Sequence, residues 1–304
     1  ETRIAASFAQ LLYEYLDRQG LDGQRVLGSR PDPSQHFVPM GQWQDWLRTV
    51  DALEARPGLG LRIAEGVSAR HFGVVGYAAL ACSNLAEALQ RMERYHASVY
   101  DANPAHVEVR SDGVVVEWGV ERGRPGALVD ETAIASLVQL ARDMTGHYWP
   151  MRKVSFVNPP PADVQPYSDF FGCEVSFNAP TTRLEFDTAC LALPMRKADP
   201  ALAQLLDQQA EAAFDGGGGA LVLEQQRGVD RQDVFGTTDL ARRIAHAIDV
   251  VGVLELHTQR GRDTLRAGLR QGTAMQQHPA RAEEQAGGLQ GVTVRSSHKP
   301  CCLS

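Results

Sequence analysis

Apolar residues recur every three to four positions in two stretches near the start of the chain, which is the spacing of a helix with one buried face. The first stretch covers residues 4 to 19, stops at Gly20 and consists of Ile4, Phe8, Leu11, Leu12, Tyr15 and Leu16. The second covers residues 42 to 55, stops before Pro57 and consists of Trp43, Trp46, Leu47, Val50 and Leu53. Prolines at 31, 33 and 39 predict an extended connector between these two helices.

Between residues 71 and 120 the pattern changes from glycine-rich to helical and then to alternating. Glycines at 73 and 76 indicate a loop. Asn84 and Glu87 have the spacing of a capping box, so a helix should begin at residue 85 and end near Tyr100. Valines alternate with other residues on both sides of the Ser-Asp-Gly turn at 111–113, which predicts a β-hairpin with one buried face.

The pattern from there to residue 214 predicts two more helices and further strands. Helical spacing returns between residues 134 and 144, and Asp199 with Pro200 should begin a helix that buries Leu202 and Leu205. Residues 154–157 and 174–187 have the composition of strands. Helices and hairpins come in blocks rather than in β-α-β alternation. The predicted fold class is therefore α+β, with helices packed on a mainly antiparallel sheet that grows by hairpins.

Length and composition allow two domains and restrict the class of protein. The chain has 304 residues, 43% apolar content and a net charge of -7, which argues against nucleic acid bound over its whole surface. Its five cysteines lack regular spacing and indicate reduced thiols. Because there is neither a long apolar run nor a signal sequence, we expect a cytoplasmic protein without a membrane segment.

Several short motifs occur in order along residues 8 to 213. They are Pro-Gly-Leu-Gly-Leu at 57–61, Phe-Gly-Val-Val-Gly-Tyr at 72–77, Val-Ser-Phe at 154–156, Phe-Gly at 171–172, Val-Ser-Phe at 175–177, Leu-Glu-Phe at 184–186 and Ala-Asp-Pro-Ala-Leu at 198–202. Together they resemble the effector domain of AraC-type transcription regulators, in the branch called arabinose-binding-like. The resemblance implies a bacterial regulator, dimeric, with a sensor for a small metabolite and two helix-turn-helix units that bind DNA.

The C-terminal third matches that family only in part. We expect an effector and dimerisation domain at 1–213, a Gly-rich linker and connecting segment at 214–237, a partial, largely helical helix-turn-helix region at 238–270 and a disordered tail at 271–304. The capped segment from Thr238 to Asp249 resembles a first helix, so Thr238, Arg242, Arg243 and His246 are candidates for DNA contact. The recognition helix and second unit are missing, which a reading-frame slip after about residue 249 or a natural truncation would explain.

Aromatic residues are the candidates for an effector pocket, because small-molecule sites are concave and mostly apolar. Together with one loop histidine the candidates are Trp43, Trp46, His71, Tyr77, Tyr95 and Trp118. Aromatic residues at such spacings also form ordinary core, and a loop histidine is often only solvated. Asp130 and Glu131 are interpreted as the charged first turn of a helix rather than as an acid/base pair.

No combination of residues predicts catalysis. The glycines near residue 60 lack the context of a phosphate loop, no nucleophile has a partner base, and His298 with Cys301 and Cys302 is an incomplete metal set. We therefore predict no enzyme activity, no cofactor and no metal. The predicted function is ligand-responsive transcription regulation, and the alternative is a stand-alone ligand-binding or dimerisation module that has lost DNA binding.

Overall fold

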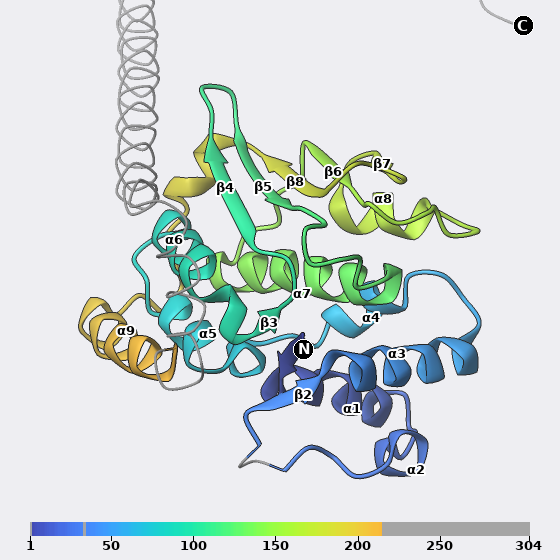
Figure 1. Cartoon of the computed structure of the whole chain (residues 1–304). Helices are drawn as coiled ribbons and strands as arrows, with labels where there is room; N and C mark the ends of the chain where they lie inside the picture. The colour runs from blue at the N-terminus through green and yellow to red at the C-terminus, as the bar shows by residue number, and fades with distance from the viewer. Residues whose placement is uncertain (1, 33–34, 215–304) are drawn as a thin grey trace, which may run out of the picture. The chain divides into compact units, whose positions relative to one another are not determined.

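A computed structural model describes residues 2–32 and 35–214, and it confirms the predicted α+β class (Figure 1). The N-terminal layer contains, in chain order, β1 (Arg3–Ala5), α1 (Ala6–Arg18), α2 (Gly23–Leu27), β2 (Phe37–Pro39) and α3 (Met40–Glu54). Both predicted helices are present. The connector is only partly extended: the Asp22 carboxylate caps the short helix α2, whereas Pro39 lies in the extended strand β2, which pairs with β1.

The middle of the chain is more helical than its glycines indicated. It contains α4 (Leu59–Ala64), the short helix η1 (Ala69–Phe72), α5 (Gly73–Leu80), α6 (Leu85–Tyr95) and the short helix η2 (His96–Ser98). The loop expected near residue 73 is therefore wrong. A Cβ on Gly76 would lie 2.1 Å from the carbonyl oxygen of Ala69, so this glycine permits α5 to pack against η1 rather than to form a loop.

The start of α6 is confirmed, and its end differs from the prediction. The Asn84 side chain accepts a hydrogen bond from the Glu87 amide, as the spacing indicated, while the Glu87 carboxylate accepts one from the Ser83 amide. The helix ends at Tyr95 instead of Tyr100. Tyr100 begins β3 (Tyr100–Asp101), which pairs with β1, so a long-range strand pairing ends the helical segment.

A five-stranded sheet forms the second layer. Its strands lie in the order β4 (Ala105–Val109), β5 (Val114–Trp118), β8 (Thr182–Phe186), β6 (Lys153–Ser155) and β7 (Val175–Ser176). The mainly antiparallel character is confirmed, since only β6 and β7 pair in parallel. Growth by hairpins was wrong. Only β4 and β5 form a hairpin, because residue alternation selects a buried face but not a neighbouring strand.

Helix α7 (Ala127–Thr145) packs on this sheet and closes the core (Figure 1). Val116 on β5 is paired with Leu184 on β8, so both side chains point to one face. Leu137 and Met144 of α7 lie with them around one apolar cavity. The sheet and α7 therefore share one core.

Two further α-helices and the short helix η3 (Thr188–Ala192) complete the described part. α8 (Gln165–Phe171) lies between β6 and β7 in the chain, and α9 (Pro200–Phe214) packs against α5. Asp199 caps α9 as predicted, but Leu202 and Leu205 are exposed rather than buried. The buried face of α9 instead contains Ala203, and its register is set by two 2.7 Å hydrogen bonds from Arg91 of α6 to Asp207.

Helices α4 and α7 cross at Gly60. A Cβ there would lie 2.6 Å from the Thr132 amide nitrogen and from the Glu131 side chain. The Gly60 amide donates a 2.7 Å hydrogen bond to the Glu131 carboxylate, and the Tyr167 hydroxyl donates a short hydrogen bond to its other oxygen. This cluster of Gly60, Glu131 and Tyr167 holds α4, α7 and α8 together.

We expect Gly60→Ala to lower the free energy of unfolding by about 1–3 kcal/mol, because the added methyl group overpacks the crossing. Gly41→Ala is the control, since nothing lies within 4 Å of a Cβ at that helical position. It should raise stability by up to about 1 kcal/mol. Urea denaturation of the full chain measures both. Equal effects of the two substitutions would contradict this account of the crossing.

Candidate functional site

Cavities that differ in volume and in lining residues lie next to α7. The Asp130 pocket has a volume of about 50 Å³ and lies at the N-terminal end of the helix. An open cleft of about 470 Å³ is bordered by the proline run at 159–161, Glu131 and Tyr167. An apolar cavity of about 70 Å³ lies between α5, α6, α7 and the sheet. The Asp130 pocket combines aromatic surface with a half-buried charged group, and the open cleft is also lined by aromatic and charged residues.

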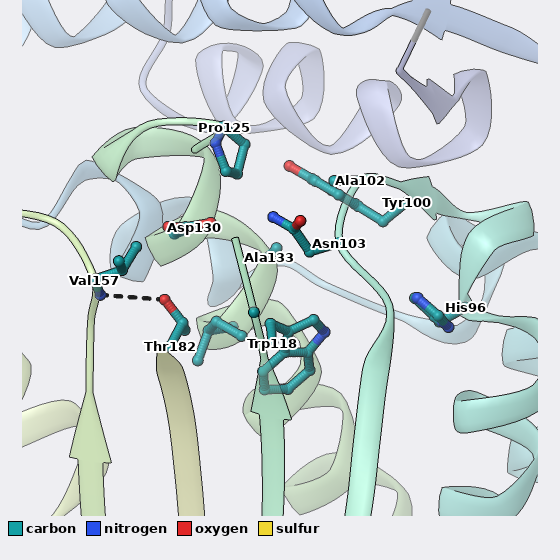
Figure 2. A pocket seen from close by; sticks show the side chains of 12 residues that line it. His96, Tyr100, Ala102, Asn103, Trp118, Pro125, Asp130, Ala133, Val157 and Thr182 are labelled. Carbon is teal, nitrogen blue, oxygen red and sulfur yellow. Dashed lines mark hydrogen bonds between the residues drawn. The ribbon is translucent and has the colours of Figure 1, made fainter. Parts of the chain in front are cut away.

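The Asp130 pocket is formed where several strands reach the same edge of the sheet. Trp118 is the last residue of β5 and is paired with Thr182, the first residue of β8. Val157 follows β6, and its amide donates a 3.3 Å hydrogen bond to the Thr182 hydroxyl. Figure 2 shows these side chains gathered around one space together with Asp130 of α7.

A second group of residues reaches the pocket from the segment between α6 and β4. His96, Tyr100, Ala102 and Asn103 line it from this side (Figure 2). The short strand β3 places Tyr100 there, because β3 is anchored to β1 in the N-terminal layer. The pocket thus lies where the two layers of the described structure meet.

Most polar groups of the pocket already have partners within the protein. The His96 Nε2 atom accepts a hydrogen bond from the Ala105 amide and its Nδ1 atom faces the Glu93 carbonyl, so the ring is neutral with the proton on Nδ1. Burial also lowers the pKa of His96. Asn103 donates to the Gly123 carbonyl and accepts from the Arg122 amide.

The Tyr100 hydroxyl is similarly engaged. It accepts a 2.8 Å hydrogen bond from the Trp43 indole and donates to the Val129 carbonyl at 3.4 Å. Burial raises the pKa of Tyr100, so the hydroxyl stays protonated. These contacts leave Asp130 as the pocket group with capacity for a further strong interaction.

Asp130 is a carboxylate without a cationic partner among the described residues. The Asn158 amide donates a hydrogen bond to Oδ2, and no arginine, lysine or histidine of the described part pairs with the group. Burial raises the pKa of Asp130 to about 6, against the opposing effect of the Asn158 hydrogen bond. The charged form is therefore costly in the folded protein.

The adjacent Glu131 differs from Asp130 in its hydrogen-bond partners, although burial raises the pKa of both carboxyl groups. Asp130 lies in the first turn of α7, where the helix dipole favours negative charge, as interpreted from the sequence, and Glu131 directly follows that turn. Glu131 is 4% exposed and receives two hydrogen bonds, from Gly60 and Tyr167. Consecutive helix residues point about 100° apart, so one carboxylate belongs to the core and the other to the pocket.

The structure places the six predicted ligand residues at different sites. Only Trp118 lines the Asp130 pocket, and Trp43 reaches it indirectly by donating to Tyr100. Trp46 packs edge-on against Tyr13, and Tyr95 is buried at the end of α6. Tyr77 is 48% exposed on α5. The described structure therefore does not gather these six residues into one pocket, and ligand contact remains a prediction for each.

His71 is buried instead of solvated. Its Nδ1 atom accepts a 2.9 Å hydrogen bond from the Ser68 amide, and its Nε2 atom lies 3.1 Å from the Glu14 carboxylate. Burial lowers its pKa, although Glu14 acts in the opposite direction. This arrangement caps η1 and joins it to α1, which accounts for the histidine without a ligand.

The pocket residues that sequence reasoning missed are His96, Tyr100, Asn103, Asp130 and Thr182. The sequence predicts Tyr100 at the end of a helix and Asp130 in the charged first turn of a helix. The sequence contained one signal for Asp130. Ala133 and Ile134 follow it three and four positions later, so the face of the helix that carries Asp130 is otherwise apolar. The partners across the pocket are distant in sequence and gave no such signal.

Other chemical features of the described part are limited. No group of three or more His, Cys, Asp or Glu side chains within residues 2–32 and 35–214 could hold a metal ion. Cys82, Cys173 and Cys190 are free thiols. None of the helices in the described ranges combines the length and apolar character needed to cross a bilayer. The candidate DNA contacts Thr238, Arg242, Arg243 and His246 lie outside the described residues, as do the boundaries expected beyond residue 214.

Comparison with known proteins finds a matching family model, a similar curated protein and a similar solved structure. Residues 16–195 match the model of the arabinose-binding domain of AraC transcription regulators, N-terminal part. The chain is 29% identical over 213 residues to the ornithine utilization regulator of Pseudomonas aeruginosa, an alignment that covers 68% of this chain and 62% of that protein. The crystal structure of the transcriptional regulator CdpR from Pseudomonas aeruginosa gives a TM-score of 0.48 at 18% identity and 85% coverage of both chains.

We expect Asp130→Asn to change the pH dependence of stability. An unfolded aspartate ionises near pH 4, whereas the folded group ionises at about 6. The folded protein therefore binds more protons in this window, and it loses stability as the pH rises through it. The neutral variant lacks this loss, so it should gain up to about 3 kcal/mol over the parent at about pH 7.5 and almost nothing near pH 4.

Denaturation of both proteins across this pH range measures the difference. Asp45→Asn is the matched control, because it makes the same chemical change in a side chain that is 72% exposed. That control should alter stability by less than about 0.5 kcal/mol at either pH. A gain for Asp130→Asn that is the same at both pH values would contradict the assigned environment.

Proposed function

The chain belongs to the AraC transcription regulators that carry an arabinose-binding domain, and on this basis we propose that it regulates transcription in response to a small molecule. The members of this family are regulators and not enzymes. The effector would bind in the N-terminal domain, at 1–213. DNA would be contacted by residues 238–270, after a connecting segment at 214–237.

The observation that carries the proposal is the unpaired Asp130 carboxylate inside the family-matched domain. A carboxylate held in a pocket at a cost to stability is typical of a functional site, because stability alone would favour an uncharged side chain there. Trp118 supplies apolar surface beside it. These features suit the recognition of a small molecule better than they suit a packed core.

Contacts within the domain connect the Asp130 pocket to α9, the helix at the C-terminal end of the domain. Helix α7 extends from Asp130 to the apolar cavity, which is also lined by Val75 of α5 and Leu89 of α6. Helix α9 packs on α5 and is joined to α6 through Arg91 and Asp207. A ligand that favours one position of α7 would thereby favour one position of α9, the last helix before residue 215.

DNA contact is proposed from the sequence of residues 238–249. Thr238 would cap a helix, and Arg242, Arg243 and His246 would present hydrogen-bond donors to phosphate oxygens. A homodimer would contact two half-sites, and such a regulator would act in the cytoplasm. The alternative is a stand-alone sensor or dimerisation module without DNA binding, favoured by the lack of a recognisable second helix-turn-helix unit in the sequence.

We expect the full chain to retain DNA from the region upstream of its own gene in a gel-shift experiment, with affinity that falls as salt rises. Arg242→Ala with Arg243→Ala should lower the slope of log affinity against log salt by about 2. The matched control replaces Arg48 and Arg110, whose guanidinium groups form exposed ion pairs. That control should leave the slope unchanged.

Two outcomes would decide against the regulator. Failure to retain DNA at low salt would support the stand-alone module. An equal loss of slope in the control pair would show that net charge, and not the segment at 238–249, determines DNA binding. A small molecule that binds the N-terminal domain should also change the measured DNA affinity, because coupling between two sites is reciprocal.

A further inference from the structure

We infer that the Asp130 pocket binds the protonated amino group of a small amine, so that the effector is a cation with an unbranched carbon chain next to its nitrogen. This inference rests on the proposed sensing function and names the ligand class for the same site. It follows from the charge, the hydrogen-bonding capacity and the size of the pocket.

The charge of the pocket favours a cation. Asp130 is its only carboxylate, and its titratable neighbours across the space, His96 and Tyr100, are both neutral. Arg122 is not among the residues that line the pocket, and it pairs with Asp101 and donates to the Ala102 carbonyl. An anionic ligand would meet an unbalanced negative charge, whereas a cation would neutralise it.

Hydrogen bonding favours a group that donates. Asn158 occupies Oδ2 of Asp130, and the described structure assigns no donor to Oδ1. His96 already uses its donor and its acceptor within the chain, and Asn103 uses its carbonyl oxygen and one of its two N–H donors. An ammonium group has N–H donors for Oδ1, and a charge-assisted hydrogen bond of this kind is stronger than one between neutral groups. A quaternary ammonium has no N–H and would leave Oδ1 without a partner.

The walls and the volume of the pocket limit the ligand further. The rings of Trp118 and Tyr100 supply aromatic surface, which attracts a cation through its π electrons. A volume of about 50 Å³ is far below the several hundred Å³ that enclose a whole drug-sized ligand. It suits an ammonium group with a few methylene carbons and excludes a branched or aromatic group at that end.

The test uses calorimetry on the full chain with n-propylamine and 1,4-diaminobutane as probes. Both should bind at about pH 7.5, while n-propanol, propionate and tetramethylammonium should bind at least tenfold more weakly. Because an ionised Asp130 is required and its pKa is about 6, amine affinity should fall roughly tenfold near pH 5. Asp130→Asn should lower amine affinity at least tenfold, and Trp118→Leu severalfold.

Asp45→Asn is the matched control and should bind the amines as the parent does, since its carboxylate is exposed on α3. A melting curve for each variant shows that it is folded. Equal binding of amines by the parent and by Asp130→Asn would overturn the inference, as would equal binding of propionate and propylamine.

The calorimetry and the gel-shift experiment together distinguish a failure of the proposed ligand class from a failure of the proposed regulation. DNA retention by the full chain without any amine binding overturns the ligand class and leaves the regulator standing. Amine binding that depends on Asp130, without DNA retention, supports the ligand class and overturns the proposed regulator in favour of a stand-alone sensor.

Discussion

The buried carboxylate of Glu131 is the interaction on which the described architecture depends. It accepts hydrogen bonds from the Gly60 amide and the Tyr167 hydroxyl, and so it joins α4, α7 and α8. A carboxylate that is 4% exposed is tolerated only when its oxygens have partners. The close crossing at Gly60 brings the backbone of α4 within reach of that group. Helix α7 is thereby held in place directly after its first turn, which carries Asp130.

Two adjacent acidic residues consequently have different roles. Burial raises the pKa of both carboxyl groups, but Glu131 joins three helices through its two hydrogen bonds, whereas Asp130 receives only the Asn158 hydrogen bond within the described structure. The difference arises from geometry, since the two side chains leave one helix in different directions. A rigid helix thus holds an unpaired charge at a fixed position between aromatic walls. Such preorganisation is what a recognition site for a small charged molecule requires.

The sequence predicted those features that depend on neighbouring residues. The stripes of α1 and α3, the cap at Asn84 and the hairpin of β4 with β5 are each encoded within about twenty positions. Features that depend on distant partners were missed. The segment predicted as the end of a helix forms β3 instead, because Tyr100 pairs with Ile4. Strand β8 lies beside β5, although more than sixty residues separate the two strands in the sequence. The glycines of α5 predict a loop from sequence, but Gly76 serves close packing against η1, which depends on the tertiary structure.

By itself, the sequence determined the α+β class, the order of most helices and the family, because amphipathic periods, caps and short motifs are local properties of the chain. Tertiary structure alone decided the pocket. Trp118 was recognisable as an aromatic candidate, but its neighbours Asp130, Tyr100 and Thr182 come from separate elements that meet at one edge of the sheet. Whether a carboxylate is solvated, paired or left without a cation depends on what surrounds it in space, and that information is not contained in the spacing of residues along the chain.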